Sequence, residues 1–326
     1  MSYSTPTPTA AAPQPGIAIS DRDLRRRESR RKLSHSKVML LMMALPVVYF
    51  LVFRYAPMFG LVIAFKDYNV FLGLRASEWV GLRNFRELFA SPDFWQIFRN
   101  TLVISLMKLI IGFPIPIILA LLLNEIRSTG FKRVMQTVLY LPYFISWAII
   151  GTMILVLFSP TSGLLSGVSI WLTGERMNLL TSAEHFRGIL VVSDIWRNAG
   201  WGTIIYLAAI SQVDPNLYEA AIVDGANKLR QIWHVTIPAI AGVIVLLFIL
   251  RVGWMMHAGF EQILVLQNPL VMDVSDIFDT YVYRVGLGRG EYSYTATAEM
   301  FKSVISLVLI YGTDRLAKAL GEEGLL

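Results

Sequence analysis

The sequence of 326 residues contains no cysteine, which excludes disulfide bonds, thiolate metal sites and cysteine nucleophiles. Its four histidines, at positions 35, 185, 234 and 257, are too widely separated to indicate a metal site. Charged residues make up only 16% of the chain, whereas hydrophobic residues make up 55% and the mean hydropathy is +0.55. This composition predicts an all-α, polytopic membrane protein.

Sequence motifs of ATP binding and of hydrolysis are also missing. The chain has no G-x-x-x-x-G-K-[ST] phosphate loop, so it cannot bind ATP in that way. It has no Gly-x-Ser-x-Gly or His-Glu-x-x-His motif, and His257 has no evident catalytic partner, which argues against an intramembrane hydrolase. We expect no enzyme activity, no bound cofactor and no metal. An ion-driven secondary transporter is an alternative of another class, although the chain shows no convincing inverted repeat.

Apolar runs of about 20 residues predict six transmembrane helices. The runs are Val38–Leu61 (interrupted by Arg54 and Pro57), Thr101–Leu123, Val134–Phe158, Gly188–Ser211, Ala239–Ala258 and Tyr294–Tyr311, or as far as Asp314. Together with the segments between them, these runs predict four regions of the chain. The regions are a basic, partly disordered cytoplasmic tail (1–37), the first span with an external loop (38–99), a five-helix core that includes the loop 212–238 (100–316), and a cytoplasmic C-terminal tail (317–326).

The basic residues predict the orientation of the chain. Eight Lys and Arg residues lie between Arg22 and Lys37, beside the first span, so the net charge of +6 does not indicate a nucleic-acid partner. A signal peptide is the competing interpretation, but the following apolar stretch is too long for one and lacks a small-residue cleavage site, so we expect the tail to be retained in the cytoplasm. With the tail inside, cytoplasmic segments hold 15 Lys and Arg in about 70 residues, and external loops hold nine in about 100. We expect a multi-pass membrane protein with both termini in the cytoplasm.

A polar stretch, Asp214–Pro238, lies between two of the predicted spans. Asp214 is a good N-cap, and Pro215 suits the first position of a helix. Gly225 can take the left-handed conformation that ends such a helix. A second short helix is expected to stop before Pro238. Two short helices joined at a bend on the cytoplasmic side predict a projection that fits a socket on another protein.

This stretch resembles the EAA loop of membrane subunits in bacterial ABC importers, which implies that the chain lies in the bacterial inner membrane. The residues that carry the resemblance are Glu219, Ala220, Ala221, Asp224, Gly225, Ala226, Trp233 and Pro238. Trp233 stands where Phe is usual in the family, and Ile237 stands where Leu is commoner. In that family the loop carries a coupling helix that docks in a cleft of the ATP-binding subunit. The resemblance implies that Glu219 meets a basic residue of the ATPase and that Gly225 sets the angle between the two helices.

Further segments are similar to the carbohydrate-importing, type I branch of these permeases, which has a MetI-like fold. They include GLVIAFKDYN (60–69), WVGLRNF (79–85), YLPYFISW (140–147), GWGTIIYLAAI (200–210) and NPLVMDVSDIFDTYVYRVGL (268–287). The resemblance implies a second homologous permease subunit, two ATP-binding subunits that hold ATP and Mg, and a periplasmic or extracellular solute-binding protein. The implied cargo is an oligosaccharide derived from a polysaccharide. An acidic, uronate-containing cargo such as alginate is our expectation, and a neutral sugar or another small solute is the alternative.

Charged residues within spans are costly and therefore informative. They are Arg54, Lys108, Asp194, Arg197, Arg251, Glu299 and Lys302. Asp194 with Arg197, and Glu299 with Lys302, are three residues apart and can neutralise each other. The remaining cations have no obvious local partner, so we expect an outer cavity of net positive potential that suits an acidic oligosaccharide. Snorkelling to the interface, or pairing with the second permease, explains lone cations equally well.

Three tryptophans in the spans are candidates for stacking on sugar rings. They are Trp196, Trp201 and Trp254. Aromatic residues at helix ends are more often anchors at the membrane interface, which is the competing interpretation of each.

Overall fold

The computed structural model describes residues 37, 39–159, 163–174, 178–319, 321 and 324. The chain divides into two compact parts, Met1–Gly60 and Leu61–Leu326. The predicted tail up to residue 36 lies outside the described residues, as does most of the C-terminal tail after residue 319.

A single apolar helix, Met39–Phe65, begins in the first part and contains most of the first predicted span. Its hydrogen bonding changes midway, because Leu51–Tyr55 (η1) is π-helical and Ala56–Phe65 (η2) is a 3₁₀ helix. Pro57 lies in η2 and has no N–H to donate, so a regular α-helical ladder cannot continue through it. The side chain of Arg54 is exposed within η1.

The second part is built almost entirely of helices. Its helices of ten or more residues are α4 (Pro92–Gly112), α5 (Pro114–Glu125), α6 (Thr129–Tyr140), α7 (Trp147–Leu157), α8 (Leu164–Thr173), α9 (Ala183–Ile210), α13 (Ala241–Gly253) and α17 (Tyr292–Ala319). Shorter α-helices are α2 (Gly73–Ala76), α3 (Arg83–Ala90), α10 (Pro215–Val223), α11 (Lys228–Gln231), α12 (Ile237–Ala239), α14 (Phe260–Leu266), α15 (Met272–Ser275) and α16 (Phe278–Tyr281). The 3₁₀ and π segments are η3 (Leu141–Phe144), η4 (Ile232–Thr236), η5 (Met255–His257), η6 (Pro269–Val271) and η7 (Val282–Leu287). Two short strands, β1 (Lys66–Asp67) and β2 (Glu78–Trp79), pair antiparallel with Lys66 opposite Trp79.

Helices occupy all six predicted spans, but two of these spans are bent. By length and composition, two helices of the described residues can cross a membrane, Met39–Phe65 and Pro92–Glu125, or up to four if each bent pair is one span. The third span bends by 97° between Phe144 and Trp147, and the fifth bends by 64° near Ile240. The fourth and sixth predicted spans lie in α9 and α17, which are long enough to cross a membrane but less apolar than these helices.

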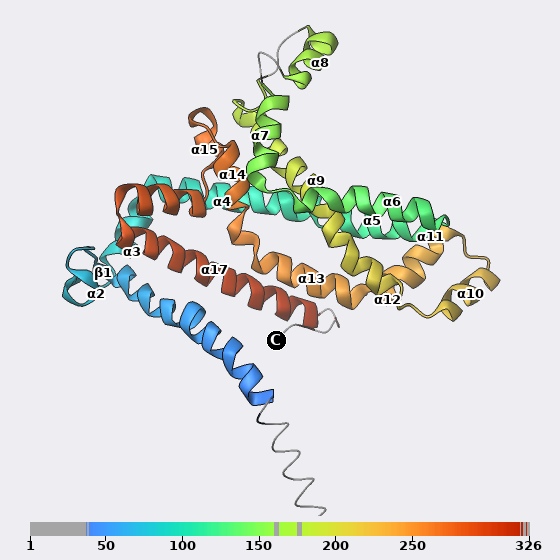
Figure 1. The fold of residues 1–326 in the computed structure, drawn as a ribbon, viewed down its shortest axis with the longest axis horizontal. Coiled ribbons are helices and arrows are strands. Elements are labelled where there is room, and N and C mark those ends of the chain that lie inside the picture. Colours follow the sequence, from blue (N-terminus) through green and yellow to red (C-terminus); the bar gives the residue numbers. More distant parts are fainter. Residues whose placement is uncertain are drawn as a thin grey trace, which may run out of the picture. The chain divides into compact units, whose positions relative to one another are not determined.

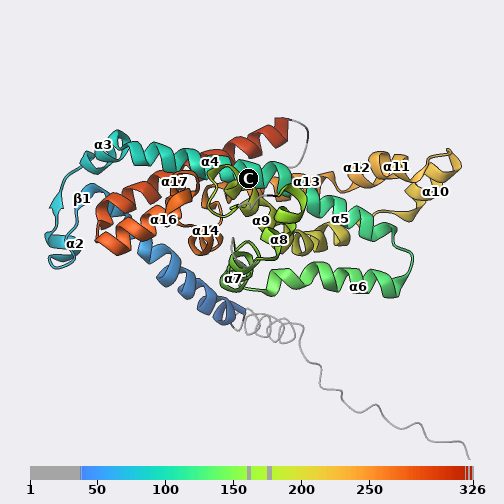
Figure 2. The same cartoon turned by 90° about the horizontal axis from the view of Figure 1, so that it is seen from above.

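The helices of the second part pack mainly around α9. Helices α4, α5 and α6 contact α9, and α13 contacts α17. At Gly200 the backbones of α9 and α6 nearly touch, since an added Cβ would lie 1.9 Å from the carbonyl oxygen of Leu139. Figures 1 and 2 show α10 and α11 together at one end of this part, beyond the helices that flank them.

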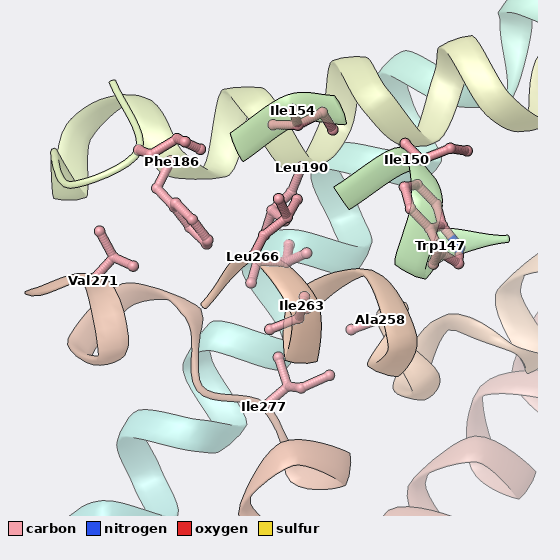
Figure 3. Packing of buried hydrophobic residues seen from close by; sticks show 12 residues of the cluster. Trp147, Ile150, Ile154, Phe186, Leu190, Ala258, Ile263, Leu266, Val271 and Ile277 are labelled. Atoms are coloured by element: carbon pink, nitrogen blue, oxygen red, sulfur yellow. The ribbon is translucent and has the colours of Figure 1, made fainter. Parts of the chain in front are cut away.

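Three clusters of buried apolar side chains hold the second part together. The largest joins α7, α9 and α14 through residues such as Ile150, Leu190 and Ile263, which are labelled in Figure 3. A second cluster is aromatic, with Phe94 of α4 packed against Phe278 and Phe301. Because lipid is as apolar as these side chains, close packing rather than removal from water stabilises such clusters within the membrane.

Candidate functional site

Residues 212–238, named here the coupling loop, adopt the two short helices that the sequence predicts. The carboxylate of Asp214 accepts a hydrogen bond of 2.9 Å from the backbone N–H of Asn216 and caps α10. Gly225 has a φ of +76° and turns the chain between the helices. The side chain of Asn227 accepts a hydrogen bond of 2.9 Å from the N–H of Arg230 and starts α11. Short polar caps thus fix both helix starts.

The predicted end of the second helix is wrong. The helix continues through Pro238, because the π segment η4 precedes α12, and the chain first departs from helical geometry at Ile240. The N–H of Ile237 donates to the carbonyl of Ile232, five residues earlier. A wide turn of this kind makes room before a proline ring, which would otherwise clash with the carbonyl of the preceding turn.

Several contacts hold the coupling loop in one shape. The hydroxyl groups of Tyr218 and Thr236 are 3.0 Å apart, and the amide of Gln231 donates to the carbonyl of Ala226 at 2.9 Å. Lys228 forms an ion pair of 3.4 Å with Glu125 at the end of α5. These contacts join the loop to itself and, through the exposed Lys228–Glu125 pair, to the end of α5.

The coupling loop exposes a large apolar surface. Its exposed apolar side chains are Leu217, Ile222, Val223, Leu229 and Trp233. Of the predicted docking residues, Ala221 and Ala226 are half-buried, and the others are exposed, namely Glu219, Ala220, Asp224, Gly225, Trp233 and Pro238. Glu219 forms no ion pair within the part of the chain that the structure describes. An exposed apolar patch on a rigid projection is typical of a protein-binding surface.

A second group of predicted residues meets inside the bundle, where three helices share one carboxylate. Asp194 of α9 lies 3.5 Å from the Nζ of Lys108 on α4 and 3.4 Å from the Nη2 of Arg251 on α13. The side-chain amide of Asn198 donates a further hydrogen bond of 3.1 Å to Asp194. Sequence spacing considers only partners on the same helix, which is why these partners from other helices were missed.

Arg197 does not pair with Asp194 as expected. Its Nε donates a hydrogen bond of 3.1 Å to the carbonyl of Ile145, and its guanidinium lies 5.4 Å and 5.0 Å from the ring centroids of Tyr143 and Trp147. Ile145 lies at the 97° break of the third span, where helical hydrogen bonds are lost. Arg197 therefore replaces a missing backbone donor, a requirement of any broken helix at membrane depth.

Lys108 and Arg251 differ in their exposure. The side chain of Lys108 is only 6% exposed, and its ammonium donates to the carbonyl of Ala258 at 2.9 Å and to the side chain of Gln262. It holds a turn in which Ala258 and Gly259 have φ values of +46° and +97°. The side chain of Arg251 is 45% exposed. Arg251 is therefore the more exposed cation of this cluster.

These groups line a small pocket, named here the cationic pocket, of about 180 Å³. Its lining includes Ser105, Lys108, Asp194, Arg251, Trp254 and His257. Two cations against one carboxylate give a net charge of +1 when His257 is neutral. A second cavity shares Asp194 and Arg251 with it and continues along α9 as far as Tyr206. Apart from Asp194, Asn198, Tyr206 and Arg251, the lining of this second cavity is apolar.

The other predicted path residues lie elsewhere. Trp201 stacks on Tyr143 with ring centroids 4.5 Å apart, and Trp196 lines an apolar pocket between α7 and α9. Lys302 forms the expected ion pair with Glu299, at 2.7 Å, and an additional one with Asp279. Asp279 lies outside the predicted spans, which is why sequence reasoning did not connect it with Lys302.

Comparisons with known proteins agree with this architecture. Residues 112–321 match the family described as binding-protein-dependent transport system inner membrane component. The polygalacturonan/rhamnogalacturonan transport system permease protein YteP of Bacillus subtilis (strain 168) is 47% identical, over 97% of this chain and 99% of its own. Protein LplB of the same organism is 45% identical, over 90% of this chain and 92% of its own.

Solved structures of a bacterial alginate transporter are also similar. One is the crystal structure of an ABC transporter in complex with an alginate pentasaccharide-bound periplasmic protein, with a TM-score of 0.83 and 35% identity. The other is described as involved in the import of the acidic polysaccharide alginate, with a TM-score of 0.82 and 35% identity. Each match covers 90% of this chain and 99% of that chain. This chain therefore belongs to the family of binding-protein-dependent transport system inner membrane components, as a non-enzymatic permease subunit of an ABC importer whose ATPase is a separate subunit.

Proposed function

We propose that this permease carries an acidic, uronate-containing oligosaccharide across the inner membrane. The observation that carries the proposal is the accessible guanidinium of Arg251 in a pocket of net positive charge. The relative with 47% identity is named for polygalacturonan and rhamnogalacturonan, and the solved structure with 35% identity is named for alginate. Polygalacturonan and alginate are polymers of uronates, and rhamnogalacturonan contains uronates. The higher identity makes galacturonate oligosaccharides the first substrates to test and alginate oligosaccharides the second.

The cationic pocket is suited to hold a carboxylate without leaving a charge unpaired. An arginine binds a carboxylate through two parallel N–H donors, and the planar guanidinium fits this geometry better than an ammonium group does. Arg251 makes a single contact of 3.4 Å with Asp194. Asp194 also contacts Lys108 and Asn198, so it keeps two partners when Arg251 turns toward a substrate.

An aromatic ring stands at the same pocket. Trp254 is 67% exposed, and its ring centroid lies 5.0 Å from that of His257. The face of a sugar ring is apolar, so an exposed indole beside a cation provides contacts for both the ring and the carboxylate of a uronate. Trp254 is the one predicted tryptophan that lines the cationic pocket.

The coupling loop transmits the energy of ATP hydrolysis in this proposal. Its exposed apolar side chains and Glu219 dock on one of two ATP-binding subunits, which hold ATP and Mg. Both termini and the loop face the cytoplasm, and a solute-binding protein delivers the oligosaccharide on the opposite side. A second, homologous permease completes the membrane unit. Closure of the ATPase dimer then moves the coupling loop and with it α5, to which Lys228 joins it.

Two measurements test the proposal. The first asks whether an ATPase copurifies with the chain from its native membrane, because an ion-driven transporter would have none. The second compares ATPase stimulation in the reconstituted importer, loaded solute-binding protein included, by acidic and neutral oligosaccharides of equal length. We expect stimulation by the acidic series. Equal stimulation by both series would refute the proposed substrate class.

A further inference from the structure

His257 lines two cavities of the bundle at once. In the cationic pocket it lies with the two cations, Lys108 and Arg251. It also lines a cavity of about 390 Å³, whose wall contains the carboxylates of Asp279 and Glu299. The side chain of His257 is 51% exposed. A histidine changes its charge near about pH 6.5, so an exposed ring at this position responds to the pH of the water around it.

The carboxylates favour a positive charge on this ring. Asp279 Oδ2 lies 3.8 Å from the Nδ1 of His257, and the two groups form an ion pair only when the ring is protonated. This oxygen accepts no hydrogen bond from the residues that the structure describes. Asp279 and Glu299 also share a single buried counterion, Lys302. One negative charge of this group therefore remains for His257 to balance.

The cationic pocket acts in the opposite direction. Lys108 and Arg251 disfavour a further positive charge beside them, and the single carboxylate of Asp194 offsets only one of the two. Protonation of His257 raises the net charge of the pocket from +1 to +2. A carboxylate bound at Arg251 would remove this opposition. Because coupling between two binding events is reciprocal, a proton on His257 must then strengthen binding of the carboxylate by the same factor.

The other ionisable groups around the ring ordinarily titrate far from pH 6.5. Helices α4, α13, α16 and α17 all contact η5, the short helix that contains His257. The described ionisable side chains that line either cavity with His257, or pair with its lining, are Lys108, Asp194, Arg251, Asp279, Tyr283, Glu299 and Lys302. Among these described groups, His257 is the one whose residue type changes its charge near neutral pH.

We infer that His257 is a proton-dependent specificity residue, whose protonated form strengthens the binding of an acidic oligosaccharide at Arg251. This inference rests on the proposed function and adds a dependence on pH. The coupling loop precedes the fifth span, so the proposed orientation places His257 toward the exterior. The strengthening is present at low external pH and is lost as the pH rises through the titration of the histidine.

The test compares three forms of the complete importer in proteoliposomes, with the solute-binding protein included. They carry the native His257, His257→Gln, which is neutral at every pH, or His257→Lys, which keeps a positive charge. The measured quantity is the concentration of galacturonate oligosaccharide that gives half-maximal ATPase stimulation, at about pH 5.5 and at about pH 8. Carboxylates titrate near about pH 4, so the substrate keeps its charge in both buffers.

Each variant is compared with the wild type at the same pH, because this ratio cancels effects of pH on the ATPase and on the solute-binding protein. At the lower pH we expect His257→Gln to need about fivefold or more substrate than the wild type, and at the higher pH to match it. His257→Lys should match the wild type at the lower pH and need less substrate at the higher pH. His185→Gln, at an exposed position that lines neither cavity, should match the wild type in both buffers.

The outcomes separate this inference from the broader proposal. If the ratio of each variant to the wild type is the same at both pH values, the role of His257 is overturned and an acidic substrate remains. Because His257 is half exposed, His257→Lys decides the question even if His257→Gln fails to assemble. Equal stimulation by neutral and acidic oligosaccharides of equal length overturns the proposed function, and this inference with it.

Discussion

Asp194 and Arg251 lie on different helices, α9 and α13, and their carboxylate and guanidinium are 3.4 Å apart at the wall of the cationic pocket. The same carboxylate lies 3.5 Å from Lys108 on α4. One carboxylate thus forms ion pairs with a buried cation, Lys108, and with an accessible one, Arg251. The two cations are expected to respond differently to substitution.

Replacing Arg251 should weaken the response to acidic substrate. Arg251→Gln removes the accessible cation. We expect the concentration of galacturonate oligosaccharide that gives half-maximal ATPase stimulation to rise by about tenfold or more, since a charge-assisted hydrogen bond contributes about 1.5–3 kcal/mol. Arg251→Lys keeps the charge without the two parallel donors and should fall in between. Arg133→Gln, at an exposed position of α6, is the control. Equal behaviour of the two glutamine variants would remove Arg251 from the substrate path.

Replacing Lys108 should destabilise the fold instead. Lys108→Met leaves the carbonyl of Ala258 and the side chain of Gln262 without their donor. It also removes the buried ion pair with Asp194, and breaking a buried ion pair costs about 3–5 kcal/mol. Thermal unfolding in detergent should therefore shift clearly downward. Lys132→Met, on the half-exposed surface of α6, should unfold like the wild type, and a Lys108→Met protein that also did so would contradict the structural role.

Gly225 should be required for its backbone conformation rather than for space. Its φ is +76° and an added Cβ would meet nothing within 4 Å, so Gly225→Ala is penalised by about 1–2 kcal/mol through the backbone alone. Gly225→Asn should restore most of the function, because asparagine adopts this conformation more readily. The measurement is binding of the ATP-binding subunits to the purified permease. Weaker binding of the asparagine variant than of the alanine variant would point to a side-chain effect.

Trp233 should contribute to docking without stabilising the isolated chain. It is 65% exposed on the coupling loop, and Trp233→Ala removes an aromatic group of the kind that dominates interfaces. We expect affinity for the ATP-binding subunit to fall by about tenfold or more, with unchanged thermal unfolding of the permease. Trp171→Ala changes a tryptophan that is 83% exposed on α8 and should bind normally. The interface assignment fails if both alanine variants bind like the wild type.

Gly200 should tolerate no side chain. Gly200→Ala places a Cβ 1.9 Å from the carbonyl oxygen of Leu139, and the resulting shift of α6 costs about 1–3 kcal/mol. Gly188 lies on the same helix with nothing within 4 Å, so Gly188→Ala should be neutral or slightly stabilising. Thermal unfolding of the two variants provides the comparison. A similar loss in both would show that helix α9 itself, rather than its contact with α6, is sensitive.

Much of the fold could be predicted because its signals are local. The capping group of Asp214 and the turn at Gly225 depend on a few neighbouring residues, and both take the predicted conformation. The continuation of the helix through Pro238 was not predicted, because a π turn has no simple sequence signature. The bend of the third span was also missed, because the side chain that satisfies its free carbonyl, Arg197, comes from another helix and is distant in sequence.

The candidate site was predicted only in part for the same reason. Lys302 with Glu299 follows from helical spacing, and the structure shows this pair. The partners of Asp194 come from helices that are distant in sequence, so spacing cannot identify them. Asp279 was overlooked because it lies in a segment assigned to an external loop, although it pairs with a lysine of the sixth span.

The direct contact at Gly200 limits how the bundle can change shape. Between most packed helices a layer of side chains permits small sliding motions, or shear. Here the carbonyl of Leu139 fills that layer, and no flexible side chain separates the two backbones. We therefore expect helices α6 and α9 to move as one rigid body, and a hinge of the transport cycle to fall outside their contact, at a segment such as Ser211–Asp214.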